Sequence, residues 1–377
     1  MKLTSPKFDE NEIELVKECL NSGWVTQGPM VRKFETLFAE YHKIPYALAT
    51  TSCTAALHLA TMALGLGPDD EVIVPAFTWI TSANSVEYVG AKPVFADIDL
   101  DTFNLDPLAF EAAITPRTRA VVVVHLFGLA ADMDSIMSIA RRNNLHVIED
   151  AACAIGTTYN GQFVGGIGDI GCFSFHPRKI ITTGEGGMVT TRDEGLKNKI
   201  ASLRNHGSAG VNPEIANKPY GMAGFNMLGY NLRLSDIQAA VGVAQMAKLD
   251  PLLSERRLRA ERYNTLLKDA EVLALPSTSP KYGHTYQSYV VRLRDGDVHR
   301  RNRIMDGLQA RQIETRPGTH AVHRLAYYKE KYHLHSEMFP NACKGEDMTI
   351  TLPIFPDMKD AEQDFVVESV LDALKHK

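Results

Sequence analysis

The sequence predicts an α/β protein with a mostly parallel central sheet and a smaller α/β domain at its carboxyl end. Two observations lead to this prediction. Apolar runs typical of buried strands alternate with helical patterns about every 25 to 30 residues, as expected of strands joined by right-handed crossover helices. The chain of 377 residues is also too long for one small core, so two domains are expected.

The amino-terminal part begins with two predicted helices. Asp9 is a capping residue with Glu12 three positions later, and the first helix ends at residues 21–23. Its apolar residues share one face: Ile13, Val16 and Leu20. Helical spacing of apolar residues resumes over 31–41. The connector between these helices is either a plain loop or the border of a pocket.

Buried strands of the central sheet are predicted next. A helix-forming segment follows an apolar run several times; the runs cover 71–75, 92–97, 120–125, 145–150 and 188–192, and another ends at Phe175. The segment 207–230 is rich in Gly, Asn and Pro and is longer than an ordinary connection, which favours a functional or interface loop. Residues 231–236 then cap a further helix.

We place the boundary between the domains at Asp250–Pro251. The large domain then covers 1–250 and the small domain 251–377, and the amino-terminal segment could pack on the small domain. The small domain is predicted to contain a charged helix, a strand and an amphipathic helix, over 253–268, 288–293 and 302–312.

The bulk composition excludes several classes of function. Lys and Arg total 40 against 45 acidic residues and are scattered along the chain, so no nucleic-acid partner is expected. The amino terminus has no secretory pattern, and no uncharged run reaches the roughly 18 residues of a membrane helix. Five cysteines without CxxC spacing argue against a disulfide framework or a zinc site. We therefore expect a cytoplasmic protein that binds neither membranes nor metals.

Lys179 and Asp150 are the first candidates for a functional site. Lys179 lies in a turn between the apolar run ending at Phe175 and the glycine-rich stretch 184–187, and Asp150 ends another predicted strand. A lysine and an acid are the groups that bind the aldehyde and the pyridine nitrogen of pyridoxal 5'-phosphate (PLP). The spacing alone leaves a structural lysine near a surface turn equally open.

Two further features are predicted at the carboxyl ends of strands. Residues 49–58 pass from a turn of small residues into a helix, whose first amides, with Ser52 and Thr54, could bind an anion or simply cap the helix. Trp79 offers a flat face for a heteroaromatic ring, or packs in the core. Because ligands of parallel sheets bind at this edge, both features and Asp150 are expected to face one crevice.

With these residues in view, the chain resembles the DegT/StrS family of PLP-dependent sugar-nucleotide aminotransferases, which have the type I PLP-transferase fold of aspartate aminotransferase. The resemblance runs from Trp24 to the carboxyl terminus. It rests on motifs that occur in the family's order: GWVTQGP, SCTAAL, FTW, VHLFG, EDAA, SFHPRK with TGEGG, and GYNLRL.

The resemblance implies roles for particular residues. Lys179 and Asp150 would be catalytic, with Lys179 binding the PLP aldehyde and moving the substrate proton while Asp150 pairs with the pyridine nitrogen. Trp79 would stack on the ring. The phosphate would be held by Ser174, Thr54, the Cys53 amide and, from a partner subunit, Asn231. A homodimer with shared active sites is therefore implied.

The resemblance also implies the reaction. A nucleotide-linked keto sugar, of the 6-deoxy type, would receive an amine from L-glutamate, and Lys179 in place of the histidine of related sugar dehydratases favours transamination. Thr26, His320 and His323 would contact the substrate. Relatives often carry Gln, His or Glu beside the cofactor where this chain has Cys153. Three questions stay open. Amination could be at C3 or C4, the substrate could be another ketone such as a cyclitol or an eight-carbon keto sugar, and the chain could be a noncatalytic regulatory protein.

Overall fold

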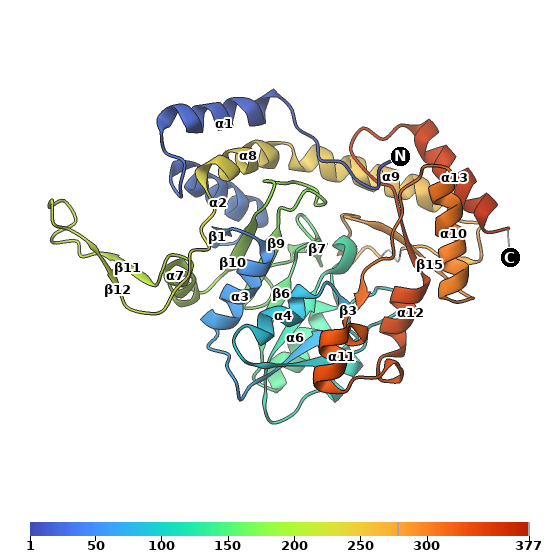
Figure 1. Cartoon of the computed structure of the whole chain (residues 1–377), viewed down its shortest axis with the longest axis horizontal. Helices are drawn as coiled ribbons and strands as arrows, with labels where there is room; N and C mark the ends of the chain where they lie inside the picture. Colours follow the sequence, from blue (N-terminus) through green and yellow to red (C-terminus); the bar gives the residue numbers. More distant parts are fainter. Residues whose placement is uncertain (277–278, 376–377) are drawn as a thin grey trace.

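The structure, a computed structural model, describes residues 1–276 and 279–375. Its central sheet has seven strands in the order β1-β10-β9-β6-β5-β2-β4 (Figure 1). The strands are β1 (Tyr46–Thr50), β2 (Glu71–Pro75), β4 (Lys92–Ala96), β5 (Thr118–Val124), β6 (His146–Asp150), β9 (Ile170–Ser174) and β10 (Gly187–Thr191). Only β10 runs antiparallel to its neighbours β1 and β9, so the predicted mostly parallel sheet is confirmed.

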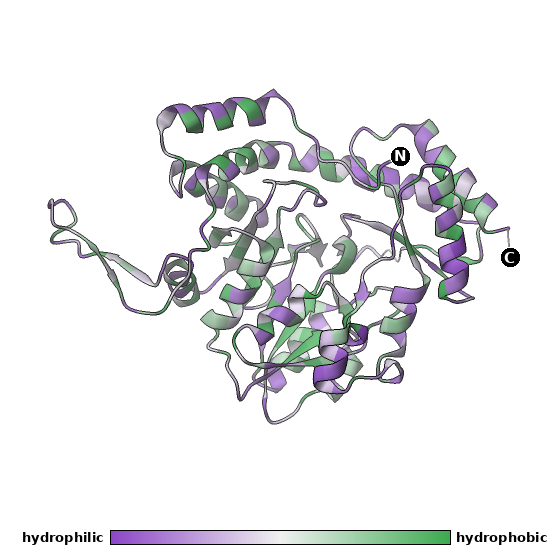
Figure 2. Ribbon diagram, viewed as in Figure 1, coloured by the Kyte–Doolittle hydropathy of each residue, from purple (hydrophilic) through white to green (hydrophobic). Residues whose placement is uncertain are grey.

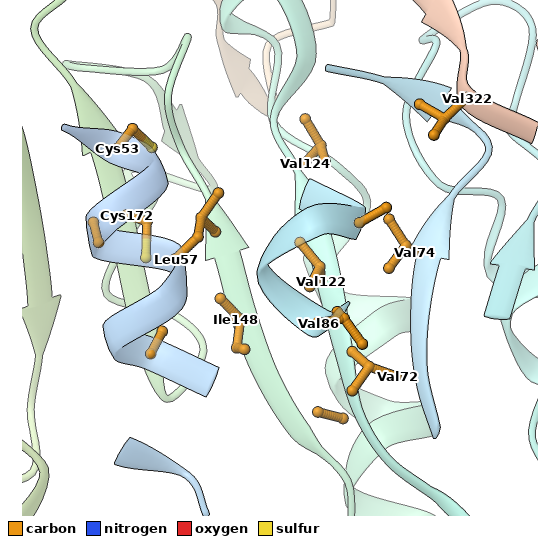
Figure 3. Packing of buried hydrophobic residues seen from close by; sticks show 14 of the residues in the cluster. Cys53, Leu57, Val72, Val74, Val86, Val122, Val124, Ile148, Cys172 and Val322 are labelled. Carbon is orange, nitrogen blue, oxygen red and sulfur yellow. The ribbon is translucent and has the colours of Figure 1, made fainter. Parts of the chain in front are cut away.

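Helices cover both faces of the central sheet. One face packs against α3 (Cys53–Ala63), α4 (Thr81–Glu87) and α7 (Glu194–Leu203). The other packs against α2 (Pro29–His42), α5 (Pro107–Ala112), α6 (Met133–Arg142) and α8 (Asp236–Ala247). Figure 3 shows Leu57 of α3 and Val86 of α4 directed at strand residues such as Ile148 and Val122. Because both faces are buried, the strands are apolar almost throughout, which explains why they were visible as continuous runs.

A second, smaller core lies at the carboxyl end of the chain. It contains the sheet β13-β15-β17, formed by β13 (Leu273–Ala274), β15 (Tyr289–Leu293) and β17 (Thr349–Leu352), and the helices α9 (Leu249–Leu267), α10 (Val298–Ala310) and α13 (Asp360–Ala373). Asp250 and Pro251 lie in the first turn of α9, where a proline costs no helical hydrogen bond. Leu253 packs in the large core and Ala260 in the small one, so one continuous helix joins them.

The amino-terminal residues lie against the small core. Glu314 N donates to Met1 O (3.0 Å) and Ile354 N to Leu3 O (3.1 Å). The helix α1 (Glu10–Ser22) begins at Asp9 with a capping box to Glu12 and ends at Gly23, as the sequence predicts. Its buried residues, however, are Glu12 and Cys19, whereas Ile13 and Leu20 are exposed.

The remaining elements connect these parts. They are β3 (Phe77–Thr78), β7 (Thr158–Tyr159), β8 (Gln162–Phe163), β11 (Ser208–Val211), β12 (Ala223–Phe225), β14 (Tyr282–Gly283), β16 (His320–Ala321), α11 (Ala326–Tyr332), α12 (Pro340–Met348) and three 3₁₀ turns, η1 (Leu126–Gly128), η2 (Val322–Arg324) and η3 (Ser336–Met338). The hairpin β11–β12 projects from the body of the molecule (Figures 1 and 2), and it occupies the predicted interface loop. Within the described residues, no helix is both long and apolar enough to cross a bilayer.

Candidate active site

Asp150 is a buried carboxylate at the carboxyl end of β6. It is 4% exposed, and its oxygens accept hydrogen bonds from the Ser82 hydroxyl (2.7 Å) and Ala152 N (3.2 Å). Burial raises the pKa of Asp150 above its ordinary value, and these two donors and the Lys179 ammonium only partly offset that rise. A cation bound next to this carboxylate would offset the remaining cost of burying its charge.

The neighbouring Glu149 shows the opposite balance, although it is also fully buried. It points to the other face of the sheet, where His125 Nε2 and the backbone amides of Gly165, Ile167 and Gly168 lie 2.7–2.9 Å from its oxygens. Burial alone would raise the pKa of Glu149, but these donors hold it below its ordinary value. The protein thus supplies enough hydrogen-bond donors to stabilise the ionised Glu149 carboxylate, but not enough to stabilise that of Asp150.

Lys179 is held close to Cys153. Its Nζ donates to the Cys153 Sγ (3.1 Å), and its backbone N donates to His176 O in a tight turn. The lysine therefore projects from the β9–β10 connection toward the segment that follows β6. Burial and the negative charge of Asp150 raise the pKa of the Cys53 thiol, and the Lys179 ammonium offsets part of that rise.

A candidate anion site lies at the start of α3. Ala55 N and Ala56 N donate to Ser52, so the amides of Cys53 and Thr54 precede the first helical hydrogen bond. A Cβ at Gly187 would lie 2.7 Å from Cys53 N, so only glycine lets β10 approach this helix end so closely. Ser174 is the residue paired with Gly187 on the next strand. These amides and the Ser174 hydroxyl could therefore bind one phosphate.

Trp79 and His320 face each other across the rim of the site. The pairing of β16 with β3 places His320 opposite Thr78, and the rings of Trp79 and His320 are 5.6 Å apart. Trp79 is 55% exposed, so its indole face is open to a ligand. The core-packing interpretation of Trp79 does not describe this geometry.

The structure leaves three candidates apart from this cluster. Asn231 is exposed, and its neighbour Leu232 accepts a hydrogen bond from Thr51 N beside the start of α3. Thr26 is exposed on the connector between α1 and α2, where its carbonyl accepts a hydrogen bond from Asp236 N (2.9 Å). His323 is 1% exposed with its Nε2 3.4 Å from the Cys343 Sγ, so it is a core residue and is not available to a substrate in this structure.

Two residues of the site were not identified from the sequence. Ser82 holds Asp150 and is itself hydrogen-bonded to the Thr78 hydroxyl (3.0 Å). Thr78 ends β3 and Ser82 lies in the first turn of α4, so their contact depends on the turn between the two elements and has no periodic signal in the sequence. Arg316 is the second, a half-buried residue whose charge interacts with Cys153 and Arg178.

These groups fit PLP. The flat, exposed Trp79 suits a pyridine ring, and the uncompensated Asp150 carboxylate suits a pyridinium nitrogen. Lys179 offers an amine for the aldehyde, and the start of α3 suits the phosphate. The fold and the site together define a PLP-dependent aminotransferase.

Comparison with known proteins gives the family. A model of the DegT/DnrJ/EryC1/StrS aminotransferase family matches residues 6–371, and the chain belongs to this family. It is 41% identical over 374 residues to the GDP-perosamine synthase of Caulobacter vibrioides, covering 98% of this chain and 97% of that protein. It is 40% identical to the spore coat polysaccharide biosynthesis protein SpsC of Bacillus subtilis, covering 98% and 96%.

The fold is shared with solved aminotransferases. A protein of Streptococcus pneumoniae described as a sugar aminotransferase, in its PMP form, superposes with a TM-score of 0.95 at 27% identity, covering 100% of this chain and 99% of that one. Its PLP form superposes with a TM-score of 0.93. The predicted fold class and cofactor are thereby confirmed.

Asp150→Asn should separate stability from activity. Because its folded pKa is raised, the ionised carboxylate destabilises the cofactor-free protein above that pKa, and this cost disappears as the pH falls below the ordinary value of 3.8. The cofactor-free variant should therefore unfold at the same or a higher temperature than the wild type at neutral pH. Its amino-transfer rate should fall by at least about a hundredfold, because an electrostatic stabiliser is lost.

Glu149→Gln is the matched control for thermal unfolding at several pH values. Its depressed pKa means that its stabilisation is present at neutral pH and is lost in acid, so this variant should unfold at a lower temperature. Equal destabilisation by both substitutions would make Asp150 a structural carboxylate.

Proposed function

We propose that this protein transfers an amino group from L-glutamate to the keto group of a nucleotide-linked sugar. One observation supports this most directly. The Lys179 amine donates a hydrogen bond to the Cys153 thiol, close to the buried Asp150 carboxylate, whose hydrogen bonds do not offset the cost of burying its charge. The names of the relatives supply the sugar: a GDP-perosamine synthase of Escherichia coli is also 37% identical over 366 residues. A cytoplasmic location is consistent with the five free cysteines.

Each residue of the cluster has a task in this reaction. Bound PLP supplies an aldehyde for covalent attachment and a ring that withdraws electrons from the reacting carbon. Lys179 Nζ moves a proton to and from that carbon as general base and acid. Asp150, ionised, holds a proton on the pyridine nitrogen, and Ser82 keeps the carboxylate in place. Trp79 orients the ring, while the start of α3 and Ser174 bind the phosphate.

The open side of the site suits a sugar. Trp79 and His320 are both about half exposed, and His320 Nδ1 lies 3.6 Å from the Glu346 carboxylate. An imidazole with a carboxylate neighbour offers groups that bind the hydroxyls of a sugar. We propose His320, and not the buried His323, as a substrate contact.

The substrate is tested with the pyridoxamine form of the enzyme. Mixing it with a panel of nucleotide-linked 3-keto and 4-keto sugars, including GDP-linked ones, should restore the PLP absorption spectrum with at least one member. L-glutamate should then return the enzyme to the pyridoxamine form. A response only to cyclitol ketones or eight-carbon keto sugars, or to no ketone, would refute the proposed substrate.

We also propose a homodimer whose active sites are shared between subunits. The hairpin β11–β12 extends away from the body of the molecule (Figure 2). Large apolar residues in it and just after it are exposed, among them Met222 at 81% and Leu228 at 84%. Such residues on a projecting arm favour burial against another chain. Asn231 lies a few residues beyond this arm in the chain and is exposed, which supports a contact with the phosphate of the partner's site.

Mixed dimers test this sharing. Lys179→Ala and Asn231→Asp should each be inactive alone, but refolding or coexpressing them together should restore about one quarter of the wild-type activity, because half of the dimers gain one intact site. Lys179→Ala mixed with Asp150→Asn is the control and should restore nothing, since both residues belong to one chain's site. Equal recovery in the two mixtures, or none in either, would contradict sharing through Asn231.

A further inference from the structure

Cys153 is the hydrogen-bond acceptor that the protein provides for the Lys179 amine. Lys179 Nζ donates to the Cys153 Sγ (3.1 Å), and no other group among the described residues accepts a hydrogen bond from this amine. Of the five free cysteines, Cys153 is the one that is not buried. A cysteine that only filled space would suit the core, as the other four do, whereas this thiol lies in the candidate active site.

The backbone is fixed on both sides of this contact. The turn that carries Cys153 is closed by a hydrogen bond from Ala154 N to Ala151 O (2.9 Å), and both alanines are buried. The turn that carries Lys179 is closed by the bond from its own N to His176 O (2.8 Å). The contact therefore joins two preformed turns, and rotation of the two side chains is enough to make or break it.

A thiol suits a lysine that has to be held and then released. It is an uncharged, weak hydrogen-bond acceptor, so it orients the amine at little cost when the contact breaks. A carboxylate in its place would favour the ammonium form, because an opposite charge nearby stabilises the charged state. An ammonium ion has no lone pair with which to attack an aldehyde or accept a proton. The nearby Asp150 carboxylate is hydrogen-bonded to Ser82 and Ala152 instead.

We propose that Cys153 is a positioning residue for the proton transfer by Lys179. Its thiol accepts the amine whenever that amine is not bonded to the cofactor, and limits the orientations that the long side chain can take. This inference rests on the proposed function, which assigns the proton transfer to Lys179. The thiol itself neither takes the proton nor bonds to the substrate. It lowers the entropy that the lysine must lose before the proton moves.

The first test compares three variants of Cys153. Cys153→Ala removes the acceptor, Cys153→Ser keeps an uncharged one and Cys153→Glu adds a charged one. Cys19→Ala is the matched control, because it removes a thiol that donates to Trp24 O beyond the end of α1. Stopped-flow spectra of the PLP-loaded proteins give the rate and the Kd of the L-glutamate half-reaction, with protium and with deuterium on the reacting carbon. PLP content and thermal unfolding show whether each variant is folded.

The second test needs neither cofactor nor substrate. Acetic anhydride acylates uncharged amines of the cofactor-free protein, and mass spectrometry compares Lys179 with the exposed Lys33 of the same molecule. Cys153→Glu should slow the acylation of Lys179 about tenfold near neutral pH, because its carboxylate favours the ammonium form. Cys153→Ser and Cys19→Ala should stay within about threefold of the wild type, since neither adds a charge.

For Cys153→Ala we expect the L-glutamate half-reaction to slow about tenfold and its deuterium isotope effect to rise, because the lysine regains orientations that it must lose again. The Kd of L-glutamate should stay within about threefold of the wild type, and Cys153→Ser should recover most of the rate. Wild-type rates in Cys153→Ala, no recovery in Cys153→Ser or an equal loss in Cys19→Ala would overturn the proposal. Unchanged acylation of Lys179 in Cys153→Glu would also overturn it. If L-glutamate does not convert the wild type, the proposed function fails, while the acylation still decides whether Cys153 controls the Lys179 amine.

Discussion

The rest of the site depends on a carboxylate buried at the end of a parallel strand without enough donors to balance it. Asp150 receives two hydrogen bonds and keeps a raised pKa, while adjacent Glu149 receives four and has a lowered one. The same burial thus produces a structural anion on one face of β6 and an unsatisfied one on the other. In the function we propose, a protonated pyridine ring would supply the missing positive charge, so binding of the cofactor would offset the cost of burying the Asp150 carboxylate.

Both cores contribute to the site. The central sheet supplies Asp150, the Lys179 turn and the start of α3, all at its carboxyl edge. The segment after α10 supplies Arg316 and His320, and its hydrogen bonds to β17 and to β3 tie it to the small and the large core in turn. The proposed substrate contact His320 therefore depends on how the carboxyl-terminal part packs against the sheet.

The sequence predicted most of the helices and strands because the signals that define them are local. Strands such as β5 are buried on both faces and read as continuous apolar runs, and the α1 capping box needs only Asp9 and Glu12. It missed β1, whose alanines have low strand propensity and whose burial comes from pairing with distant β10. It also gave no sign that Glu12 would be buried, because its partners Gln245 and Lys248 are more than 230 residues away. Ser82 and Arg316 were missed for the same reason: their significance arises only across the folded site.

We propose that Lys179 is the residue that binds PLP beside Asp150 and Trp79. Borohydride reduction of the PLP-loaded protein makes a lysine–cofactor bond permanent, and mass spectrometry of its peptides then identifies the modified lysine. We expect a pyridoxyl group on the peptide that contains Lys179, and on no other lysine. A modified lysine elsewhere, or none in protein that has bound PLP, would contradict it.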